Sequence, residues 1–558
     1  MTSRQKAGLP YIVLAAAIFA AYTNVYQNAF VWDDLNLIVN NDSLHHWSGL
    51  ANLLTKTTNA CFYRPIQVLL YFFIYQIFGL SQAAFHGANV LLHAANACLM
   101  YWLGCRLGFY KRASFVAALL WGVHPLWSSG VAYASGTSDL LVVFFCMMGL
   151  HALLPDFAPR KFWLALLFFI LALGSKESAV VFPALVTFTL FLVNKKRLQP
   201  ATYIRTWPLW LLAAAYITGW LLCPVLNNLS QYGALVNSLY SEIYVYNFTN
   251  RTLTSLATLP VYLSLIIWPT DLHMNWASFS VFTTVWNWQV IAGVAIVVIA
   301  LLQIIWGHGR RGLPLTWGLL WFVAALSPDT GILKPIDGIF AQNWIYLPTT
   351  GLFLGVAQMT TIWIKSFNSK KALMLAAGLT ALAMLGLGTK TYLQNKILYD
   401  AGALFENVLK YNPNLPWVHY ELGMYYFERR EYKKAAEQLY TAEYYSHDLN
   451  KDDAMNLHMT LAFICLNITT AKDGGVSLKE ITSALPTSKG TPKAIEELKL
   501  AQEVDPNDYA PNLFLSVIYY YLGDKKQGDY YNAMAEKASI GNKLQKKPPL
   551  TQSASHAL

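Results

Sequence analysis

The chain has 558 residues, of which 55% are hydrophobic, 15% aromatic and only 13% charged. This balance excludes an ordinary soluble globular protein, in which about a quarter of the residues are charged. The net charge of +10 does not indicate nucleic-acid binding, because the positive excess is confined to residues 1–397, which hold 23 basic and ten acidic residues. Residues 398–558 hold 17 basic and 20 acidic residues. A positive excess among apolar stretches is typical of the loops of a membrane protein.

Apolar stretches of near-spanning length recur from Tyr11 to about Gly388 and predict a polytopic helical membrane domain over residues 1–390. The first stretch resembles a signal peptide, but no small-residue cleavage site follows it, so we expect an uncleaved signal anchor. Basic clusters fall in short loops between the stretches, and placing them in the cytoplasm orients about eleven crossings. We expect the spans at 10–27, 84–104, 114–130, 138–154, 162–174, 178–194, 207–226, 287–306, 313–327, 344–363 and 371–389.

One apolar stretch, Leu253 to Trp268, does not fit this topology. If it crossed the membrane, the basic pair Arg310-Arg311 would move to the outside, against the positive-inside rule. We therefore expect it to lie at the outer surface or to re-enter. Segments 28–83 and 227–286 are the large outer segments, and their Trp, Tyr and Phe residues between polar ones favour amphipathic helices in the interface.

The last part of the chain changes to a polar, helical pattern over residues 391–540. Its small and apolar residues follow the spacing of tetratricopeptide (TPR) repeats, and the alternative is a set of plain helical hairpins. An odd number of crossings places these repeats on the non-cytoplasmic side. Segment 468–490 resembles a loop inserted into the middle repeat, and residues 541–558 are expected to be a disordered tail. The predicted fold is therefore all-α, a membrane helix bundle followed by a TPR-like α-solenoid.

Two adjacent carboxylates, Asp33 and Asp34, follow the first span directly. Neighbouring acids at a membrane surface lose solvation and repel each other, so structure alone gives little reason for the pair. One interpretation is an aspartate pair that caps a short helix. The other is a catalytic carboxylate supported by a second one.

Further polar side chains are predicted at the same face of the membrane. Nine of the ten acids in the membrane part lie there, and acids contribute little to topology, so this clustering is independent of the rule that set it. His86 and His93 share one helix face, although each histidine alone is also consistent with a hydrogen-bonded interior residue. Together these groups predict one polar cavity at the outer leaflet. The candidate residues that support Asp33 and Asp34 are Arg64, His86, His93, His124, Asp139, Lys176 and Glu177.

Such a cavity suits transfer of a sugar from a polyprenyl-phosphate donor to a hydroxyl group of a protein or glycan. Asp33 or Asp34 would take the hydroxyl proton, and the lipid phosphate would leave against Lys176 and Arg64. A single displacement of this kind inverts the anomeric centre. The scheme requires neither a cofactor nor a metal site, although paired acids could hold a divalent metal.

Short motifs in a fixed order resemble the transmembrane and tetratricopeptide-repeat O-mannosyltransferases and their bacterial relatives. The motifs are FVWDD (30–34), YRP (63–65), FHGANVLLH (85–93), HPLWSSGVAYASGTSDLL (124–141), GSKESAVVFPAL (174–185), YLSLIIWP (262–269) and NWIYLPTTGLFL (343–354). The resemblance implies the GT-C glycosyltransferase architecture and dolichyl- or undecaprenyl-phosphate sugars as donors. It also implies that the acid pair of the first outer loop, here Asp33 or Asp34, carries the catalytic carboxylate.

One position departs from the family pattern. Relatives usually carry a Glu-Arg pair just before the Tyr-Leu-Pro motif, whereas this chain has Gln342 and Asn343. This substitution keeps a second hypothesis open, a non-catalytic membrane scaffold that recruits partners through its repeats. A polysaccharide flippase or oligosaccharide ligase is a third. The compact loops favour a bacterial inner membrane with periplasmic repeats, and a eukaryotic chain would have its repeats in the lumen of the endoplasmic reticulum.

Overall fold

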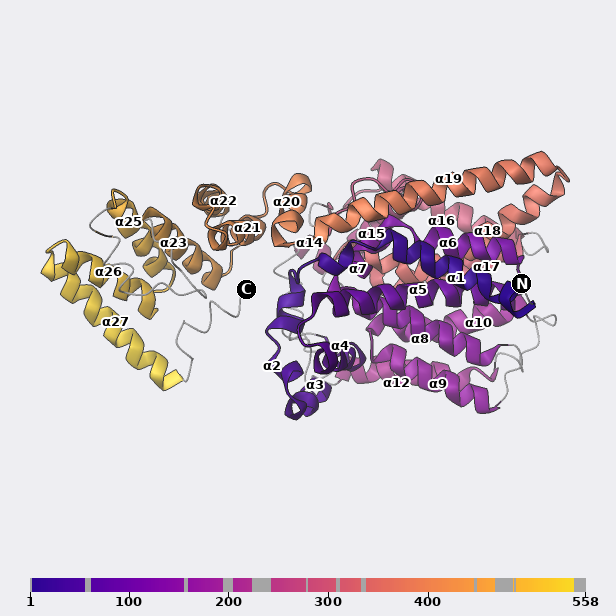
Figure 1. The fold of residues 1–558 in the computed structure, drawn as a ribbon, viewed down its shortest axis with the longest axis horizontal. Coiled ribbons are helices and arrows are strands. Elements are labelled where there is room, and N and C mark those ends of the chain that lie inside the picture. Colours follow the sequence, from indigo (N-terminus) through magenta and orange to yellow (C-terminus); the bar gives the residue numbers. More distant parts are fainter. Residues whose placement is uncertain are drawn as a thin grey trace. The chain divides into compact units, whose positions relative to one another are not determined.

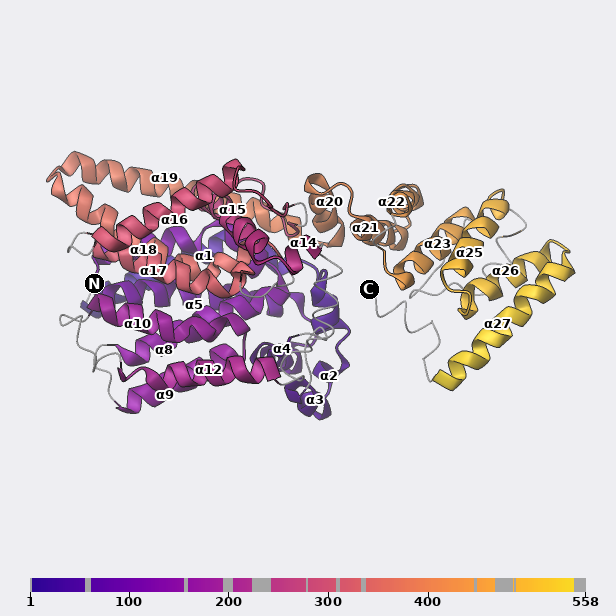
Figure 2. The same cartoon turned by 180° about the vertical axis from the view of Figure 1, so that it is seen from behind.

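The structure is a computed structural model that describes residues 3–55, 62–154, 159–193, 204–222, 242–276, 279–307, 312–332, 338–445, 449–466, 485 and 488–545. In these ranges the regular structure is helical (Figures 1 and 2). The chain divides into two compact units, Met1–Asp400 and Ala401–Leu558. Each is described by itself.

The first unit is a bundle whose long helices α5, α8 and α9 run in nearly the same direction (Figures 1 and 2). Its α-helices are α1 (Ser3–Ala21), α2 (Asp42–His45), α3 (Leu50–Thr55), α4 (Pro65–Phe78), α5 (Gln82–Arg106), α6 (Lys111–Gly122), α7 (Ser128–Val131), α8 (Thr137–Leu153), α9 (Pro159–Leu173), α10 (Phe182–Val193), α12 (Trp207–Leu222), α14 (Glu242–Val245), α15 (Phe248–Ile267), α16 (Trp288–Trp306), α17 (Leu313–Leu326), α18 (Tyr346–Ser366) and α19 (Lys370–Asn395). Short 3₁₀ and π turns between them are η1 (Val25–Gln27), η2 (Leu35–Val39), η3 (Trp47–Gly49), η4 (Pro125–Trp127), η5 (Ala134–Gly136), η6 (Glu177–Val181), η7 (Ser327–Thr330), η8 (Gln342–Ile345) and η9 (Lys396–Leu398).

Each of the eleven predicted spans overlaps an α-helix of this unit, and the third overlaps both α6 and α7. The predicted third span, 114–130, is too long, because α6 ends at Gly122 and the chain turns at His124-Pro125 into η4 and α7. A proline has no N–H to donate and clashes with the preceding turn, which explains why the helix stops there. By length and composition, three helical stretches of the described residues could cross a membrane, namely Ala134–Leu153, Trp288–Trp306 and Lys370–Leu398. The number of crossings remains a prediction.

Large apolar side chains on the outer helices of the bundle point away from the core. Trp163 on α9 is 69% exposed, Ile299 on α16 65% and Leu382 on α19 68%. Soluble proteins rarely expose apolar area over several neighbouring elements, whereas a lipid environment favours it. The bundle is therefore built for a membrane.

Helix α15 contains the apolar stretch that the topology left out. It packs against α16 closely enough that a Cβ at Gly293 would clash with the carbonyl oxygen of Leu256. Arg251 on α15 donates hydrogen bonds to the carbonyl oxygens of Val245 and Ile332, at 2.7 and 3.1 Å, and so ties α15 to flanking loops. Its placement at the outer surface remains a prediction.

The second unit consists of successive helices, α20 (Ala401–Tyr411), α21 (Pro416–Glu428), α22 (Tyr432–Tyr444), α23 (Lys451–Cys465), α25 (Thr491–Val504), α26 (Tyr509–Tyr521) and α27 (Lys525–Gln545). The small residues that the repeat pattern singled out are buried between them, Ala435, Ala442, Ala494 and Ala501 being inaccessible. The assignment as TPR repeats remains a prediction. The predicted inserted loop and tail lie mostly outside the described residues, and α27 extends to Gln545.

Candidate active site

A pocket of about 490 Å³ opens inside the first unit. Five of the predicted residues line it, namely Asp33, Arg64, Asp139, Lys176 and Glu177. Asp33 lies between η1 and η2, and Arg64 directly precedes α4. Asp139 is in the first turn of α8, Lys176 directly precedes η6, and Glu177 is its first residue. Residues far apart in sequence thus converge on one concave polar site, which is the usual form of a small-molecule site.

Asp33 and Asp34 have different surroundings, and both follow a sharp turn of the backbone. Trp32 has φ of +53°, a left-handed conformation that bulky residues rarely adopt. The chain therefore turns sharply before the two acids. The backbone N–H of Asp33 donates to the Tyr133 hydroxyl at 3.0 Å, and the Asp33 side chain lines the pocket. Asp34 is fully buried behind it.

Asp34 anchors this turn to the loop before α8. Its Oδ1 accepts hydrogen bonds from the Ser135 N–H at 2.7 Å and the Ser135 hydroxyl at 2.5 Å, and its Oδ2 accepts from the Val31 N–H at 3.1 Å. The pKa of Asp34 is raised from 3.8 to about 7, because burial and, to a smaller extent, the nearby Asp33 carboxylate outweigh the hydrogen bonds that lower it.

The loop that receives Asp34 is itself held by α4 and α5. Gln67 donates to the Ser135 carbonyl at 3.0 Å, and Asn89 donates to the Tyr133 carbonyl at 2.8 Å. A Cβ at Gly136 would clash with the carbonyl oxygen of Gly130, so the loop requires glycine at this position. These contacts fix Tyr133 and Ser135, and through them the position of both acids.

The two cations of the pocket are each held by a carboxylate. Arg64 donates from Nη2 and Nε to the two carboxylate oxygens of Glu177, at 2.7 and 3.2 Å. Lys176, which is 5% exposed, donates from Nζ to Asp139 Oδ1 at 2.7 Å. The fork geometry of Arg64 and the burial of Lys176 make both pairs better defined than exposed ion pairs.

These pairs keep the pocket charged. Burial alone would lower the pKa of Lys176, but the carboxylates of Asp139, Asp329 and Glu177 outweigh it and place the pKa above its ordinary value. Burial would raise the pKa of Glu177, and the Arg64 guanidinium more than offsets this and places it below its ordinary value. The site therefore holds an ammonium and a guanidinium at neutral pH.

Gln342 and Asn343, the two residues that depart from the family pattern, each form a hydrogen bond in the structure. Asn343 donates to Asp139 Oδ2 at 2.8 Å, so it completes the set around the carboxylate that Lys176 binds. Gln342 is buried and donates to the carbonyl oxygen of His273. Asn343 thus lies in the pocket, at the position where the resemblance implies an arginine, and Gln342 has a supporting position.

The three predicted histidines are buried but do not belong to the described lining of the pocket. His93 hydrogen-bonds the Tyr346 hydroxyl at 2.8 Å and the Gly122 carbonyl at 2.9 Å. His124 bonds the Ile266 carbonyl at 3.0 Å and accepts from the Leu126 N–H, which caps η4. His86 stacks on Phe30 at 6.4 Å. His93 and His124 are therefore hydrogen-bonded interior residues, the alternative that the sequence left open, whereas His86 is buried and neither of its ring nitrogens has a hydrogen-bond partner among the described residues.

Sequence reasoning did not select Tyr133, Ser135 and Asp329 as site residues, although all three lie in the pocket. Tyr133 and Ser135 fall inside the motif at 124–141, between the selected residues His124 and Asp139. Their place in this motif could have identified them. Asp329 is one of the nine acids predicted at the outer face. The sequence alone does not distinguish an acid on a solvated surface from an acid in a pocket.

Curated relatives share similarity along most of the chain. Protein O-mannosyl-transferase TMTC4 of Homo sapiens is 24% identical over 484 residues, covering 74% of this chain and 63% of that protein. Protein O-mannosyl-transferase TMTC3 of Mus musculus is 22% identical over 533 residues, covering 89% and 56%. The predicted resemblance to this family is confirmed. No family model matches the chain.

The chain spans less than two thirds of the length of these O-mannosyltransferases. Among solved structures, ArnT from Cupriavidus metallidurans, crystallised with undecaprenyl phosphate, matches with 16% identity and a TM-score of 0.34 over 90% of this chain and 89% of that one.

Proposed function

We propose that this chain is an inverting membrane glycosyltransferase that moves a sugar from a polyprenyl-phosphate donor to a hydroxyl group of a protein or glycan. The observation that carries the proposal is the joint presence of Asp33, Lys176 and Arg64 in one pocket. It combines a carboxylate base with two cations suited to a phosphate, which is what such a transfer needs. The O-mannosyltransferase relatives favour mannose as the sugar.

In the proposed step, the acceptor oxygen attacks the anomeric carbon while the bond from that carbon to the phosphate oxygen breaks. Asp33 takes the hydroxyl proton, and the phosphate leaves with the bonding electron pair as a lipid monophosphate. Attack opposite the leaving group inverts the anomeric centre. An ammonium offers three donors, so Lys176 can hold Asp139 and donate to the developing phosphate charge at the same time.

Asp33, and not Asp34, is the proposed base. Asp33 lines the pocket, whereas Asp34 is inaccessible and its two oxygens accept three hydrogen bonds from Val31 and Ser135. A base must reach the proton that it takes, so burial assigns Asp34 to positioning. The step uses no metal ion, and activity that survives thorough chelation would support this.

The proposed site faces the non-cytoplasmic side of the membrane, where the donor enters from the bilayer and the acceptor from the aqueous phase. This orientation rests on the positive-inside rule, and it predicts periplasmic repeats in a bacterium and lumenal repeats in a eukaryote. The repeats would present an acceptor or partner to the membrane domain.

A non-catalytic scaffold remains the second candidate, and one observation favours it. Arg64 and Lys176 in the pocket are already paired with carboxylates, and the resemblance implies an arginine at the position that Asn343 occupies. Under this alternative, the purified protein would bind no polyprenyl phosphate.

The test uses the purified full-length protein in detergent with polyprenyl-phosphate mannose as donor and a mixture of Ser- and Thr-containing peptides as acceptor. Release of lipid monophosphate and mass gain on the peptides report transfer. Asp33→Asn should abolish both signals. The matched control is Asp42→Asn, because Asp42 lies in the same outer segment and its side chain is 94% exposed. Equal transfer by Asp33→Asn and the control would refute the assignment of the base.

A further inference from the structure

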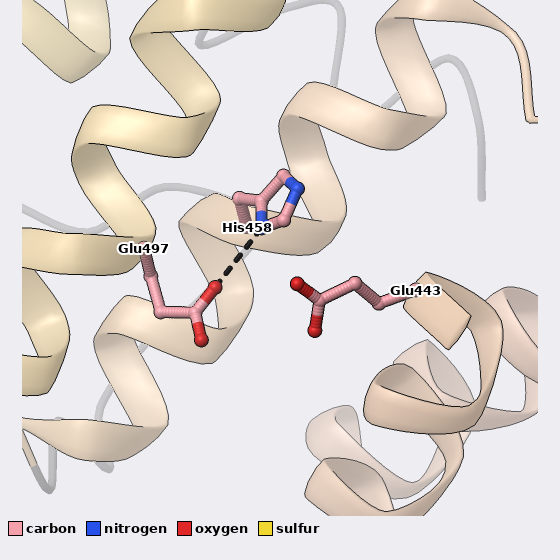
Figure 3. Close-up of side chains that lie close together, drawn as sticks. All are labelled: Glu443, His458 and Glu497. Atoms are coloured by element: carbon pink, nitrogen blue, oxygen red, sulfur yellow. Dashed lines mark hydrogen bonds and ion pairs between the residues drawn. The ribbon is translucent and has the colours of Figure 1, made fainter.

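Three helices of the second unit bring two carboxylates and an imidazole to one point (Figure 3). Glu443 comes from the end of α22, His458 from α23 and Glu497 from α25. One ligand atom from each residue lies within 4.8 Å of the other two. Figure 3 shows the three side chains pointing toward one another.

The cluster is only partly explained by an ion pair. His458 Nδ1 lies 2.9 Å from Glu497 Oε2, and Glu497 is 3% exposed. This pair accounts for two of the three residues. The Glu443 carboxylate approaches the same point, and two carboxylates so close repel each other unless a cation joins them. Among the ion pairs of the described side chains, the contact between His458 and Glu497 is the one that involves these two acids.

Lys493 compensates the two carboxylates only in part. Its charge acts on Glu443 and Glu497, but its ammonium lies over the Tyr440 ring, 4.3 Å from the centroid. Glu496, its neighbour on α25, is exposed and adds negative charge. The local balance thus favours an added cation.

We propose that Glu443, His458 and Glu497 form a binding site for a first-row divalent metal ion, with Zn²⁺ as its best-suited occupant. One imidazole and two carboxylates, with a water as fourth ligand, match the ligand types that Zn²⁺ takes in tetrahedral sites. Ca²⁺ and Mg²⁺ prefer oxygen ligands alone, so the imidazole disfavours them.

The geometry requires only a small adjustment. Two ligands of a tetrahedral zinc ion stand about 3.3 Å apart when the metal–ligand bonds are about 2.0–2.1 Å. Closing the present separation needs a shift of about an ångström or slightly more, which the partly exposed Glu443 side chain can supply by changing rotamer. The bound ion would join α22, α23 and α25, and so stabilise the folded unit by preferential binding.

The test measures metal binding without the donor or any transfer reaction, so its outcome is independent of the proposed glycosyltransferase activity. Tag-free full-length protein in detergent is stripped with a chelator and titrated with Zn²⁺. We expect one tightly bound equivalent and a Tm that rises with Zn²⁺. Glu443→Gln removes one ligand but keeps the hydrogen bond between His458 and Glu497. It should weaken Zn²⁺ binding at least about tenfold.

Glu437→Gln is the matched control, because Glu437 is an exposed glutamate on the same helix. It should bind Zn²⁺ like the unmodified chain. Substituting Co²⁺ gives a second readout, because its visible absorption bands report tetrahedral coordination, and Glu443→Gln should remove them. Equal Zn²⁺ affinity and equal Co²⁺ spectra in the two variants would overturn the proposal, as would the absence of any bound equivalent in the unmodified chain.

Discussion

The two neighbouring aspartates should respond differently to the same substitution. Asp33→Asn keeps the shape of the side chain and keeps the backbone N–H that donates to Tyr133 at 3.0 Å. Because a half-buried residue loses only its charge, the change in the free energy of unfolding should stay within about 0.5 kcal/mol. Loss of a general base should slow transfer by about 10²–10⁴-fold.

Asp34→Asn should instead lower stability. An amide keeps one oxygen, which can still accept from Ser135, but its NH₂ group cannot accept from the Val31 N–H that now bonds Oδ2 at 3.1 Å. One buried N–H then loses its acceptor and faces another donor, at a cost of about 1–3 kcal/mol. The transfer rate should fall only indirectly, to the extent that the substitution moves the Asp33 side chain.

Two measurements on each variant separate these effects. Lipid-monophosphate release at saturating donor gives the rate, and thermal unfolding in detergent gives the change in stability. The assignment of Asp33 as the base would be refuted if Asp34→Asn abolished transfer at unchanged Tm while Asp33→Asn retained most of the rate. In that case the buried carboxylate would be the base, and the pocket would have to open to expose it.

Three further outcomes follow from contacts in the same unit. Lys176→Met should destabilise the protein by about 3–5 kcal/mol and weaken binding of polyprenyl phosphate, since Asp139, whose side chain is 12% exposed, loses its cation. Thermal unfolding with and without the lipid measures both effects. The folded chain holds the Asp34 proton more tightly than the unfolded chain, because its pKa is about 7 instead of 3.8. Stability should therefore fall as the pH rises from about 4 to about 7, and Asp34→Asn should flatten that slope of Tm against pH. Gly136→Ala should cost about 1–3 kcal/mol in thermal unfolding, because its Cβ would overlap the Gly130 carbonyl oxygen, whereas Gly378→Ala, with open space around its Cβ, should not.

Sequence pattern predicted the helices of the bundle well because apolar run length is a strong signal. It failed at the end of α6, where the apolar run continues past Gly122 but the proline at 125 stops the helix. A hydropathy scale describes side chains, and it does not include the N–H that proline lacks. Hydropathy is also insufficient for α15, because its composition is consistent both with a membrane crossing and with a helix at the outer surface.

The candidate site was predicted in part, and the pattern of success has a physical cause. Charged residues at span ends are costly unless they face a polar cavity, so Lys176 and Glu177 could be selected from sequence. Histidines carry no such cost when neutral and hydrogen-bonded, and His93 and His124 are interior residues of this kind. Which charges pair could not be predicted, because the contacts of Arg64 with Glu177 and of Lys176 with Asp139 depend on helix packing.

The acid pair shows how one local conformation can give two identical side chains separate tasks. Asp33 and Asp34 are adjacent, yet one lines a pocket and the other is buried beneath it, because consecutive residues of a helical turn point in different directions. Trp32, just before them, is a bulky residue at positive φ, which costs roughly 1–3 kcal/mol, and such strain persists only where surrounding contacts hold it. Here the three hydrogen bonds accepted by Asp34 supply that hold. The buried acid therefore helps to keep the chain in the conformation that places Asp33 at the pocket, which is what the proposed division between a positioning carboxyl and a base requires.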